Sequence, residues 1–397
     1  MKKKFKKIIL HHIILKSGLL NFFEMGNRDI YKKPFDEGTI AKLDIFEHYL
    51  DSWLPTFIKK DFGKPIQIFD LFAGEGYDIN GIEGGSLRIL RVIKRYKDIL
   101  SDKKINLYLN DIDTNKIQKL ENLCKDKIKE LEIENYVNLY TSNISFREFL
   151  YKNKDKLNYG CNLIFADQNG FKEITKDVFQ FLINLETTDF LFFISSTYIK
   201  RFANSDEVKK YHPDFDFTKI KYCNYKKIHN VICEEFEKYV PENIGNYLLI
   251  PFSIMKEDKK NVYGLIFVSK HIRGIDKFLY VAWKKNNING NANFDIEKEY
   301  QKNQLGLFEY QQKTKIEVFQ ENLEKLILNK VLKSNVDVYI YTLNQGHIPA
   351  HAKEKIMEMK KNGLIYYDSR SPLINYNKIF NENRIINFTV LNEKDKN

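Results

Sequence analysis

The strongest constraint on the fold is one stretch, residues 65–86, where an apolar run ends in an acid and closely spaced glycines follow. The run Ile66–Asp70 has the length of a buried strand, and Gly74 and Gly76 come directly after it. Glycine lacks the Cβ that would keep a ligand away from backbone N–H groups, so a strand that leads into such a turn suits a nucleotide-like ligand. The alternative interpretation is a plain structural turn.

The spacing within this stretch separates two classes of ligand. Asp70, Phe72, Gly74 and Gly76 form the pattern D-x-F-x-G-x-G, which is typical of S-adenosylmethionine-dependent methyltransferases. The dinucleotide pattern G-x-G-x-x-G needs a third glycine, and Ile79 stands there instead. We therefore expect a cofactor site for S-adenosylmethionine. In this site we expect Gly74 and Gly76 to approach the methionine part of the cofactor, with Phe72 beside them. Asp70 is expected to contact the amino group of the cofactor through a water molecule.

Further apolar runs alternate with helical patterns along the chain, at residues 105–110, 137–143, 161–167 and 189–199. Such alternation predicts an α/β fold, a Rossmann-like methyltransferase-type sheet with helices on both faces. Polar residues end these strands, and parallel strands bring their carboxyl ends to one edge of a sheet. We expect Asp111 to accept hydrogen bonds from the ribose hydroxyls, with Asp113 less favoured because it suits a helix N-cap. Asn143 is expected to meet the adenine amino group.

Two segments precede the first strand. Residues 1–34 have a basic start and a short apolar stretch, too short to span a bilayer, and we expect a poorly ordered or mis-annotated extension with Met25 as an alternative start. Residues 35–54 carry a helical apolar stripe, with Thr39 as the expected cap. Lys42 falls on the opposite face, where it contacts a ligand carboxylate or, alternatively, is simply solvated. We predict no membrane association.

Composition limits the partners and the compartment. The chain has 397 residues, enough for two domains, and a formal net charge of +11, which favours an anionic partner such as nucleic acid. Its four cysteines show no C-x-x-C pairing, which argues against a disulfide framework or a zinc site and favours a reducing cytoplasm. We expect no metal site.

The last part of the chain predicts a second domain. We expect the α/β domain at 35–285, a polar linker at 286–312 and a winged helix-turn-helix domain at 313–397, since three helical patterns precede two short strands. The histidine pair His347 and His351 has helical spacing but no third metal ligand. Phosphate contacts are expected from Lys353, Lys355, Lys360, Lys361 and Arg370. The alternative is a winged helix used for protein contacts.

Several of these stretches, taken in order, resemble the three-Cys-motif partner (TcmP) family. The stretches are T-x-x-K-L-x-I-F-x-x-Y-L-x-x-W at 39–53, DLFAGEGYDINGIEGGSLRIL at 70–90, LNDID at 109–113, FADQNGFKEI at 165–174, GLIFVSKHIRGIDKF at 264–278 and AW…NGNANFDI at 282–296. The resemblance implies a methyltransferase-like protein of a two-component system. Its partner would be a radical-SAM-like protein with three cysteines, and its target nucleic acid.

The fourth-strand motif departs from that family. Where the family usually has D-P-F-G-F-K, residues 167–172 read D-Q-N-G-F-K. In methyltransferases that act on base amines, a D/N-P-P-aromatic turn orients the amine and stacks on the base. Here Asp167 is the expected orienting acceptor, with Asn169 and Lys172 as weaker catalytic candidates, but the proline is missing. The alternative is that Asp167 caps the helix after the strand.

Two functions follow from these observations. The first is an S-adenosylmethionine-dependent methyltransferase-like protein acting on nucleic acid, in which placement of the reacting atoms supplies most of the catalysis. The second is a catalytically degenerate nucleic-acid-binding scaffold or adaptor for the radical-SAM-like partner. A metal-dependent hydrolase would need clustered acids beyond Asp111 and Asp113.

Overall fold

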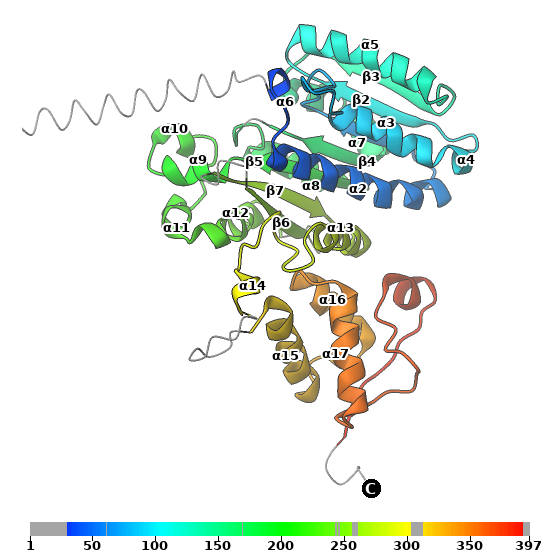
Figure 1. Ribbon diagram of the computed structural model, residues 1–397, viewed down its shortest axis with the longest axis vertical. Coiled ribbons are helices and arrows are strands. Elements are labelled where there is room, and N and C mark those ends of the chain that lie inside the picture. The colour runs from blue at the N-terminus through cyan, green and yellow to red at the C-terminus, as the bar shows by residue number, and fades with distance from the viewer. Residues whose placement is uncertain are drawn as a thin grey trace, which may run out of the picture.

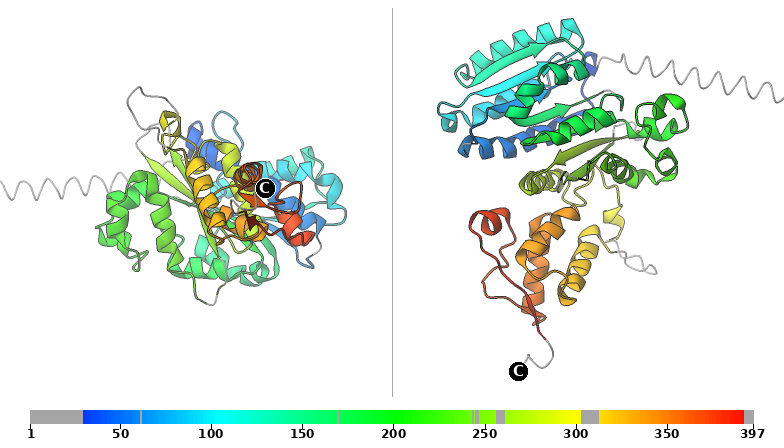
Figure 2. Two further views of the ribbon diagram at one scale, coloured as in Figure 1. Left: turned by 90° about the horizontal axis from the view of Figure 1, so that it is seen from below. Right: turned by 180° about the vertical axis from the view of Figure 1, so that it is seen from behind.

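A computed structural model describes residues 30–391 of the chain, except 61, 169, 243, 245–246, 256–260 and 303–312. Figure 1 shows an α/β body with a smaller, mostly helical part below it, and the view from behind in Figure 2 shows the same two parts. None of the helices in the described residues is long and apolar enough to cross a membrane.

The body is built on one sheet of seven strands in the order β3-β2-β1-β4-β5-β7-β6. β1 to β5 pair in parallel, and β7 runs antiparallel between β5 and β6. This is the Rossmann-like methyltransferase-type sheet expected from the sequence, completed by an antiparallel hairpin. The strands are β1 Ile66–Asp70, β2 Ile105–Asn110, β3 Val137–Ser142, β4 Cys161–Ala166, β5 Thr188–Ile194, β6 Leu248–Met255 and β7 Val262–Ser269.

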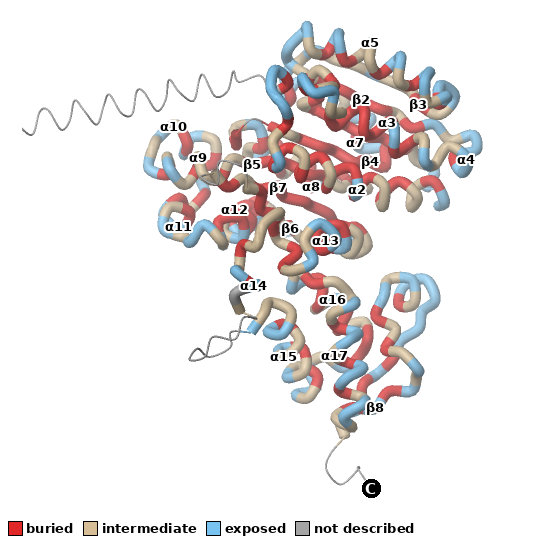
Figure 3. Tube along the Cα trace, in the orientation of Figure 1, coloured by how far each residue is buried: buried red, intermediate tan, exposed pale blue. Residues whose placement is uncertain are grey.

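Helices cover both faces of the sheet, and each face has its own apolar core. One core lies under α2, α3, α5 and α13, and the other under α6, α7, α8 and α12. Figure 3 shows the buried strands between helices whose outer sides are exposed. The helices of the body are η1 Ile30–Lys32, α2 Glu37–Lys59, α3 Gly85–Arg95, α4 Lys97–Leu100, α5 Thr114–Glu130, α6 Phe146–Lys152, α7 Lys154–Tyr159, α8 Lys176–Asn184, α9 Ser196–Arg201, α10 Asp206–Lys209, α11 Phe217–Tyr222, η2 Tyr225–Lys227, α12 Ile228–Glu237 and α13 Ile272–Lys285.

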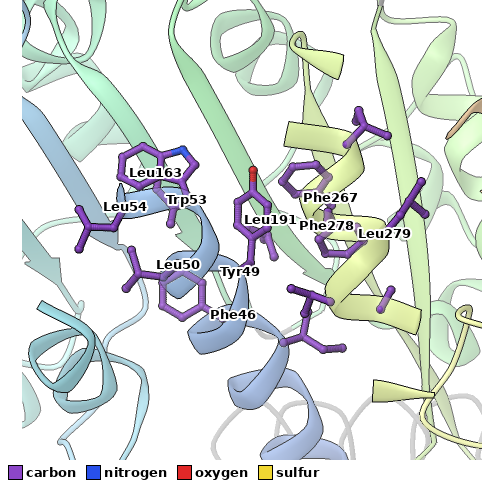
Figure 4. Close-up of a cluster of buried hydrophobic side chains, with 14 of the residues drawn as sticks. Phe46, Tyr49, Leu50, Trp53, Leu54, Leu163, Leu191, Phe267, Phe278 and Leu279 are labelled. Carbon is purple, nitrogen blue, oxygen red and sulfur yellow. The ribbon is translucent and has the colours of Figure 1, made fainter. Parts of the chain in front are cut away.

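α2 is the longest of these helices and packs its apolar stripe across the middle of the sheet (Figure 4). Phe46 is fully buried and stacks on Phe165 of β4 with ring centroids 4.3 Å apart. The cap differs from the expected one. The Asp36 side chain accepts a hydrogen bond from the Thr39 N–H at 2.7 Å, so Asp36 is the N-cap and Thr39 lies inside the first turn.

The C-terminal part has the helix order of a winged helix-turn-helix domain, with a very short wing. β8 and β9 pair over only two residues each, whereas the sequence predicted two longer strands. Residues 367–388 connect them and contain the π-helix η3. The elements are α14 Glu299–Lys302, α15 Lys315–Leu328, α16 Asn335–Asn344, α17 Pro349–Lys361, β8 Ile365–Tyr366, η3 Asn377–Asn381 and β9 Thr389–Val390.

The two parts pack directly against each other through α13. The indole Nε1–H of Trp283 donates to the carbonyl of Gly346 at 2.9 Å, and the Tyr339 hydroxyl donates to Asp276 Oδ2 at 2.8 Å. The beginning of the expected linker is also packed on the body, because Ser253 N–H on β6 donates to the Asn291 carbonyl at 2.7 Å. The end of that linker, 303–312, lies outside the described residues, as do residues 1–29 of the expected extension.

Candidate cofactor site

Three carboxyl groups meet at the carboxyl edge of the parallel strands. Asp70 ends β1, Asp111 follows β2, and Asp167 follows β4. Asp70 is 2% exposed, and its Oδ2 accepts a hydrogen bond from the Ser86 hydroxyl at 2.9 Å. Burial raises the pKa of Asp70 to about 7; Ser86 opposes this rise, and the charges of Asp167 and Asp111 add to it. A buried carboxyl of this kind suits a cationic group of a ligand.

The glycine turn is held in place by Asp111. The Gly74 N–H donates to Asp111 Oδ2, and the Asp113 N–H donates to Asp111 Oδ1, both at 2.9 Å. Gly74 has φ +68° and Gly76 has φ +101°, values that L side chains rarely adopt. Each carboxylate oxygen of Asp111 can still accept a second bond, so the geometry leaves room for the expected ribose contact.

Asp78 organises the loop that follows the turn, and sequence reasoning missed it. Its Oδ1 accepts the N–H groups of Asn80 and Ile82, and its Oδ2 accepts the N–H of Phe35 at 2.7 Å. Burial alone would raise the pKa of Asp78, but these three backbone bonds hold it below its ordinary value. The bond to Phe35 ties the segment before α2 to the glycine-rich loop. The signal in the sequence was Y-D-I-N-G, an acid two residues before Asn80 at a turn.

Tyr31 lies over the glycine turn and was also missed. Its hydroxyl donates to the carbonyl of Ala73 at 3.2 Å. A Cβ built at Gly74 would lie 2.0 Å from the Tyr31 hydroxyl oxygen, so the phenol ring fills the space that the absent side chain leaves. Burial, followed by the nearby carboxylates, raises the pKa of Tyr31 well above its ordinary value. A ligand that approaches the backbone of Gly74 must displace this ring.

Lys42 and Asp167 form a buried ion pair at the same edge. Lys42 Nζ contacts Asp167 Oδ2, with side chains 8% and 18% exposed, and lies 4.7 Å from the centre of the Phe193 ring. Lys42 thus faces the site, as expected, but its partner here is a protein carboxylate. Within the described residues, Asp167 Oδ1 has no hydrogen bond. The alternative that Asp167 caps the next helix is wrong, because Thr175 is the N-cap of α8.

The described side chains that follow Asp167 in the D-Q-N-G-F-K turn make contacts within the protein. Gln168 is buried and braces the turn: its Nε2 donates to the Phe193 carbonyl and its Oε1 accepts the Glu173 N–H, both at 2.9 Å. Phe171 is buried in the second core. Lys172 Nζ lies 3.6 Å from Glu207 at α10. Asn169 lies outside the described residues.

Two further candidates make contacts within the protein. The Asn143 Nδ2 donates to the Asp111 carbonyl at 2.9 Å, and its Oδ1 accepts the Thr114 hydroxyl at 2.8 Å. The Asn143 amide is therefore held beside Asp111 and is exposed. Phe72 is half-buried and packs on Phe146 of α6, with ring centroids 5.3 Å apart.

The basic residues expected at nucleic acid fall into two groups. Lys353, Lys361 and Arg370 are exposed, and within the described part of the chain they form no ion pair. Lys355 pairs with Glu324 and Glu358 and is 12% exposed. Lys360 donates to the carbonyls of Tyr367 and Ser369 at 2.9 Å. The second group therefore makes contacts within the domain, whereas the first group is exposed.

The histidine pair lies in the contact between the two parts of the chain. His347 Nδ1 and His351 Nδ1 are 3.1 Å apart, and both rings pack on Trp283. Burial lowers the pKa of His347 to about 2 and that of His351 to about 4, so both rings are neutral. Over the residues that the structure describes, no group of three or more His, Cys, Asp or Glu side chains is arranged to hold a metal ion.

Comparison with known proteins supports the C-terminal assignment most directly. Residues 291–372 match the family described as "GMT-like wHTH domain", which confirms the expected winged helix-turn-helix domain. A search of curated proteins finds no match.

Solved structures resemble the body only distantly. A proposed O-methyltransferase from Klebsiella pneumoniae is 10% identical over 59% of this chain and 91% of its own, with a TM-score of 0.32. The methyltransferase domain of bacterial CtHen1-C is 12% identical over 56% of this chain and 100% of its own, with a TM-score of 0.29. CrArsM, an arsenic(III) S-adenosylmethionine methyltransferase from Chlamydomonas reinhardtii, is 12% identical over 56% of this chain and 72% of its own, with a TM-score of 0.29. These likenesses are weak, and the fold assignment rests on the strand order itself.

Proposed function

We propose that the chain is an S-adenosylmethionine-dependent methyltransferase-like protein that acts on nucleic acid. The observation that carries this proposal is the convergence of the glycine turn, Asp70, Asp111 and Asp167 on one edge of a methyltransferase-type sheet. Ligands of open α/β sheets bind at that edge, outside the carboxyl ends of the strands. The winged helix-turn-helix domain supports nucleic acid as the target, because such domains commonly bind it.

The residues at this edge fit the parts of the proposed cofactor. The half-ionised carboxyl of Asp70 suits the ammonium group, Asp111 the ribose hydroxyls, and Asn143 the adenine. Gly74 and Gly76 carry no side chain over the backbone, so displacing the Tyr31 ring would give the methionine part of the cofactor access to it. When bound, S-adenosylmethionine would supply an activated methyl group on sulfur.

The protein's own part in methyl transfer would be placement of the acceptor. Asp167 Oδ1 accepts no hydrogen bond from the described residues and would accept one from an amine of the substrate, while the ion pair with Lys42 fixes the orientation of that carboxylate. Holding the nucleophile in line with the methyl group supplies most of the rate in such a reaction.

The exposed Lys353, Lys361 and Arg370 are the proposed phosphate contacts. Each phosphate that a protein neutralises releases counterions, so binding through these residues should weaken with added salt. The compartment we propose is the cytoplasm. The partner we propose is the radical-SAM-like three-cysteine protein implied by the family resemblance.

A scaffold without methyltransferase activity is the second candidate, favoured by one specific observation. In the D-Q-N-G-F-K turn, Gln168 and Phe171 are buried and Lys172 lies beside Glu207, so these three side chains are engaged within the protein. In that case the chain would bring nucleic acid to the radical-SAM-like partner.

Calorimetric titration with S-adenosylmethionine tests the proposed cofactor site. We expect micromolar binding by the wild-type protein and a loss of at least tenfold in Asp111→Asn. Asp113→Asn is the matched control, because asparagine can still cap α5 and the site is otherwise intact. If neither the wild-type protein nor Tyr31→Ala binds S-adenosylmethionine, the methyltransferase proposal is wrong.

A further inference from the structure

A second cavity lies at the opposite edge of the sheet from the glycine turn. Its volume is about 250 Å³, and its walls include Thr188 and Asp189 at the beginning of β5 and Lys270 directly after β7. α2 and α13 supply two further walls, and Tyr376 of the C-terminal domain supplies another. Ligand sites favour such places between domains.

The cavity carries an excess of positive charge. Lys60, Lys270, Arg273 and Lys277 all line it. In the described part of the chain, Arg273 forms no ion pair, and its guanidinium lies 5.0 Å from the centre of the Tyr376 ring. Lys277 Nζ donates to the Ser52 carbonyl and the Thr56 hydroxyl, and an ammonium group has a third proton to donate.

The acids in the cavity do not balance these charges. Glu186 is 80% exposed and pairs with Lys64 at 3.0 Å. Asp189 is half-buried, accepts the Tyr49 hydroxyl at 2.7 Å, and has its pKa raised by desolvation. α13 also begins here, at His271, and the beginning of a helix carries partial positive charge. The wall is therefore suited to an anion.

The opposite wall is aromatic and contains an unsatisfied donor. The rings of Trp53 and Phe57 are 4.3 Å apart, and those of Phe57 and Phe62 are 5.2 Å apart. Trp53 is 2% exposed, and its indole N–H has no hydrogen-bond partner within the described residues. Figure 4 shows Trp53 on α2 beside Tyr49. The indole nitrogen itself is enclosed, so the aromatic surface that faces the cavity is that of Phe57 and Phe62.

We propose that this cavity binds a phosphate group attached to a flat base. The phosphate would lie against Arg273, Lys277 and the beginning of α13. The base would lie along the rings of Phe57 and Phe62, of which Phe62 is 44% exposed. Two sources share this chemistry: a free mononucleotide, and the 5′-phosphorylated end of a nucleic-acid strand. This site goes beyond the proposed function and does not depend on it.

Calorimetric titration of the full-length protein with AMP tests the proposal, with adenosine and inorganic phosphate as partial ligands. We expect AMP to bind at least tenfold more tightly than either part. Arg273→Gln and Lys277→Met should each weaken AMP binding at least tenfold, and Phe62→Ala about threefold. Lys129→Ala, on an exposed face of α5, is the charge-matched control and should change nothing. Asp111→Asn should also leave AMP binding unchanged, which separates this site from the glycine turn.

A pair of oligonucleotides identifies the source of the phosphate. If the ligand is a strand end, a 5′-phosphorylated single strand should bind more tightly than the same strand with a 5′-hydroxyl, and Arg273→Gln should abolish the difference. If AMP binds and the two strands do not differ, the ligand is a free nucleotide. The proposal is overturned if AMP binds no better than adenosine, if Arg273→Gln binds AMP like the wild type, or if Asp111→Asn abolishes binding.

Discussion

Replacing Asp70 with asparagine should change how the stability of the protein depends on pH. In the folded protein the pKa of Asp70 is about 7, whereas an unfolded chain has an aspartate pKa of about 4. At pH 5 Asp70 is already ionised in the unfolded chain but still protonated in the folded protein. Raising the pH to 8 therefore removes a proton from the folded state alone, and this lowers the free energy of unfolding. The free energy of unfolding therefore has its full contribution from protonated Asp70 below about pH 4. This contribution decreases as the pH rises from about 4 and is lost once the pH has passed the folded-state pKa of about 7.

The size of this loss follows from the pKa. From pH 5 to the folded-state pKa of about 7 is roughly two pH units, and each corresponds to about 1.4 kcal/mol. Between pH 5 and pH 8 the free energy of unfolding of the wild-type protein should therefore fall by up to about 3 kcal/mol more than that of Asp70→Asn. Asparagine has the same size, and its side-chain oxygen can still accept the Ser86 hydroxyl. The charges of Asp111 and Asp167 remain in both proteins.

Urea unfolding at pH 5 and pH 8 measures this difference. Tryptophan fluorescence is a suitable probe, because Trp53 and Trp283 both lie on helices of the α/β body. Other groups that titrate in this range are common to both proteins, so the change from pH 5 to pH 8 in one is subtracted from that in the other. If the two proteins lose the same free energy of unfolding, burial does not raise the pKa of Asp70 in the folded protein, and this reasoning is refuted.

Three further predictions concern the turn above Asp70 and the winged domain. Tyr31→Ala should bind S-adenosylmethionine several-fold more tightly than the wild type by calorimetry, because no ring has to be displaced; unchanged affinity would mean that Tyr31 does not obstruct the site. Gly74→Ala should lower the free energy of unfolding by about 1 kcal/mol or more, since φ is +68° and the Tyr31 ring fills the space; an unchanged urea midpoint would contradict this. Lys361→Ala and Arg370→Ala should each reduce the salt dependence of nucleic-acid binding by about one phosphate contact, measured by fluorescence anisotropy, whereas the ion-paired Lys355→Ala serves as the control and should not.

The sheet and its acidic edge could be predicted because their signals are local. Each strand is a short apolar run with a polar residue at its end, and this pattern places Asp70, Asp111 and Asp167 together once the strands are parallel. The contact between Lys42 and Asp167 joins residues 125 positions apart, so no local pattern determines which charge Lys42 meets. The sequence indicated the direction of Lys42 but not its partner.

Tyr31 could not be predicted, because a single aromatic residue ahead of the first helix has no periodicity to place it. Its position depends on the absence of a side chain at Gly74 and on the carbonyl of Ala73, which is 42 residues away. The Phe35–Asp78 bond, which anchors the same segment, is equally distant in sequence at 43 residues. Both contacts depend on how the chain before α2 crosses the glycine-rich loop.

The wing shows why apolar alternation alone overestimated the strands. Asn335 is fully buried, and its side chain donates to the carbonyl of Arg384 and accepts the N–H of Ile386. Phe388 N–H donates to the carbonyl of Lys333. The backbone of the last segment therefore pairs with the beginning of α16, and only Thr389 and Val390 are left to pair with β8. The sequence of this last segment is strand-like, but most of its backbone hydrogen bonds go to the beginning of α16 and not to another strand.

The two proposed sites lie at opposite edges of one sheet, and α13 links the second site to the winged domain. α13 begins at the cavity with His271, and Trp283 near its end bonds the carbonyl of Gly346, just before the beginning of α17. Tyr376 makes a second connection, because it lines the cavity from the loop between β8 and β9. The guanidinium of Arg273 lies 5.0 Å from the centre of the Tyr376 ring, so the residue proposed to hold the phosphate also contacts the winged domain. If a ligand moves Arg273, this contact is the direct route by which the position of the winged domain would change.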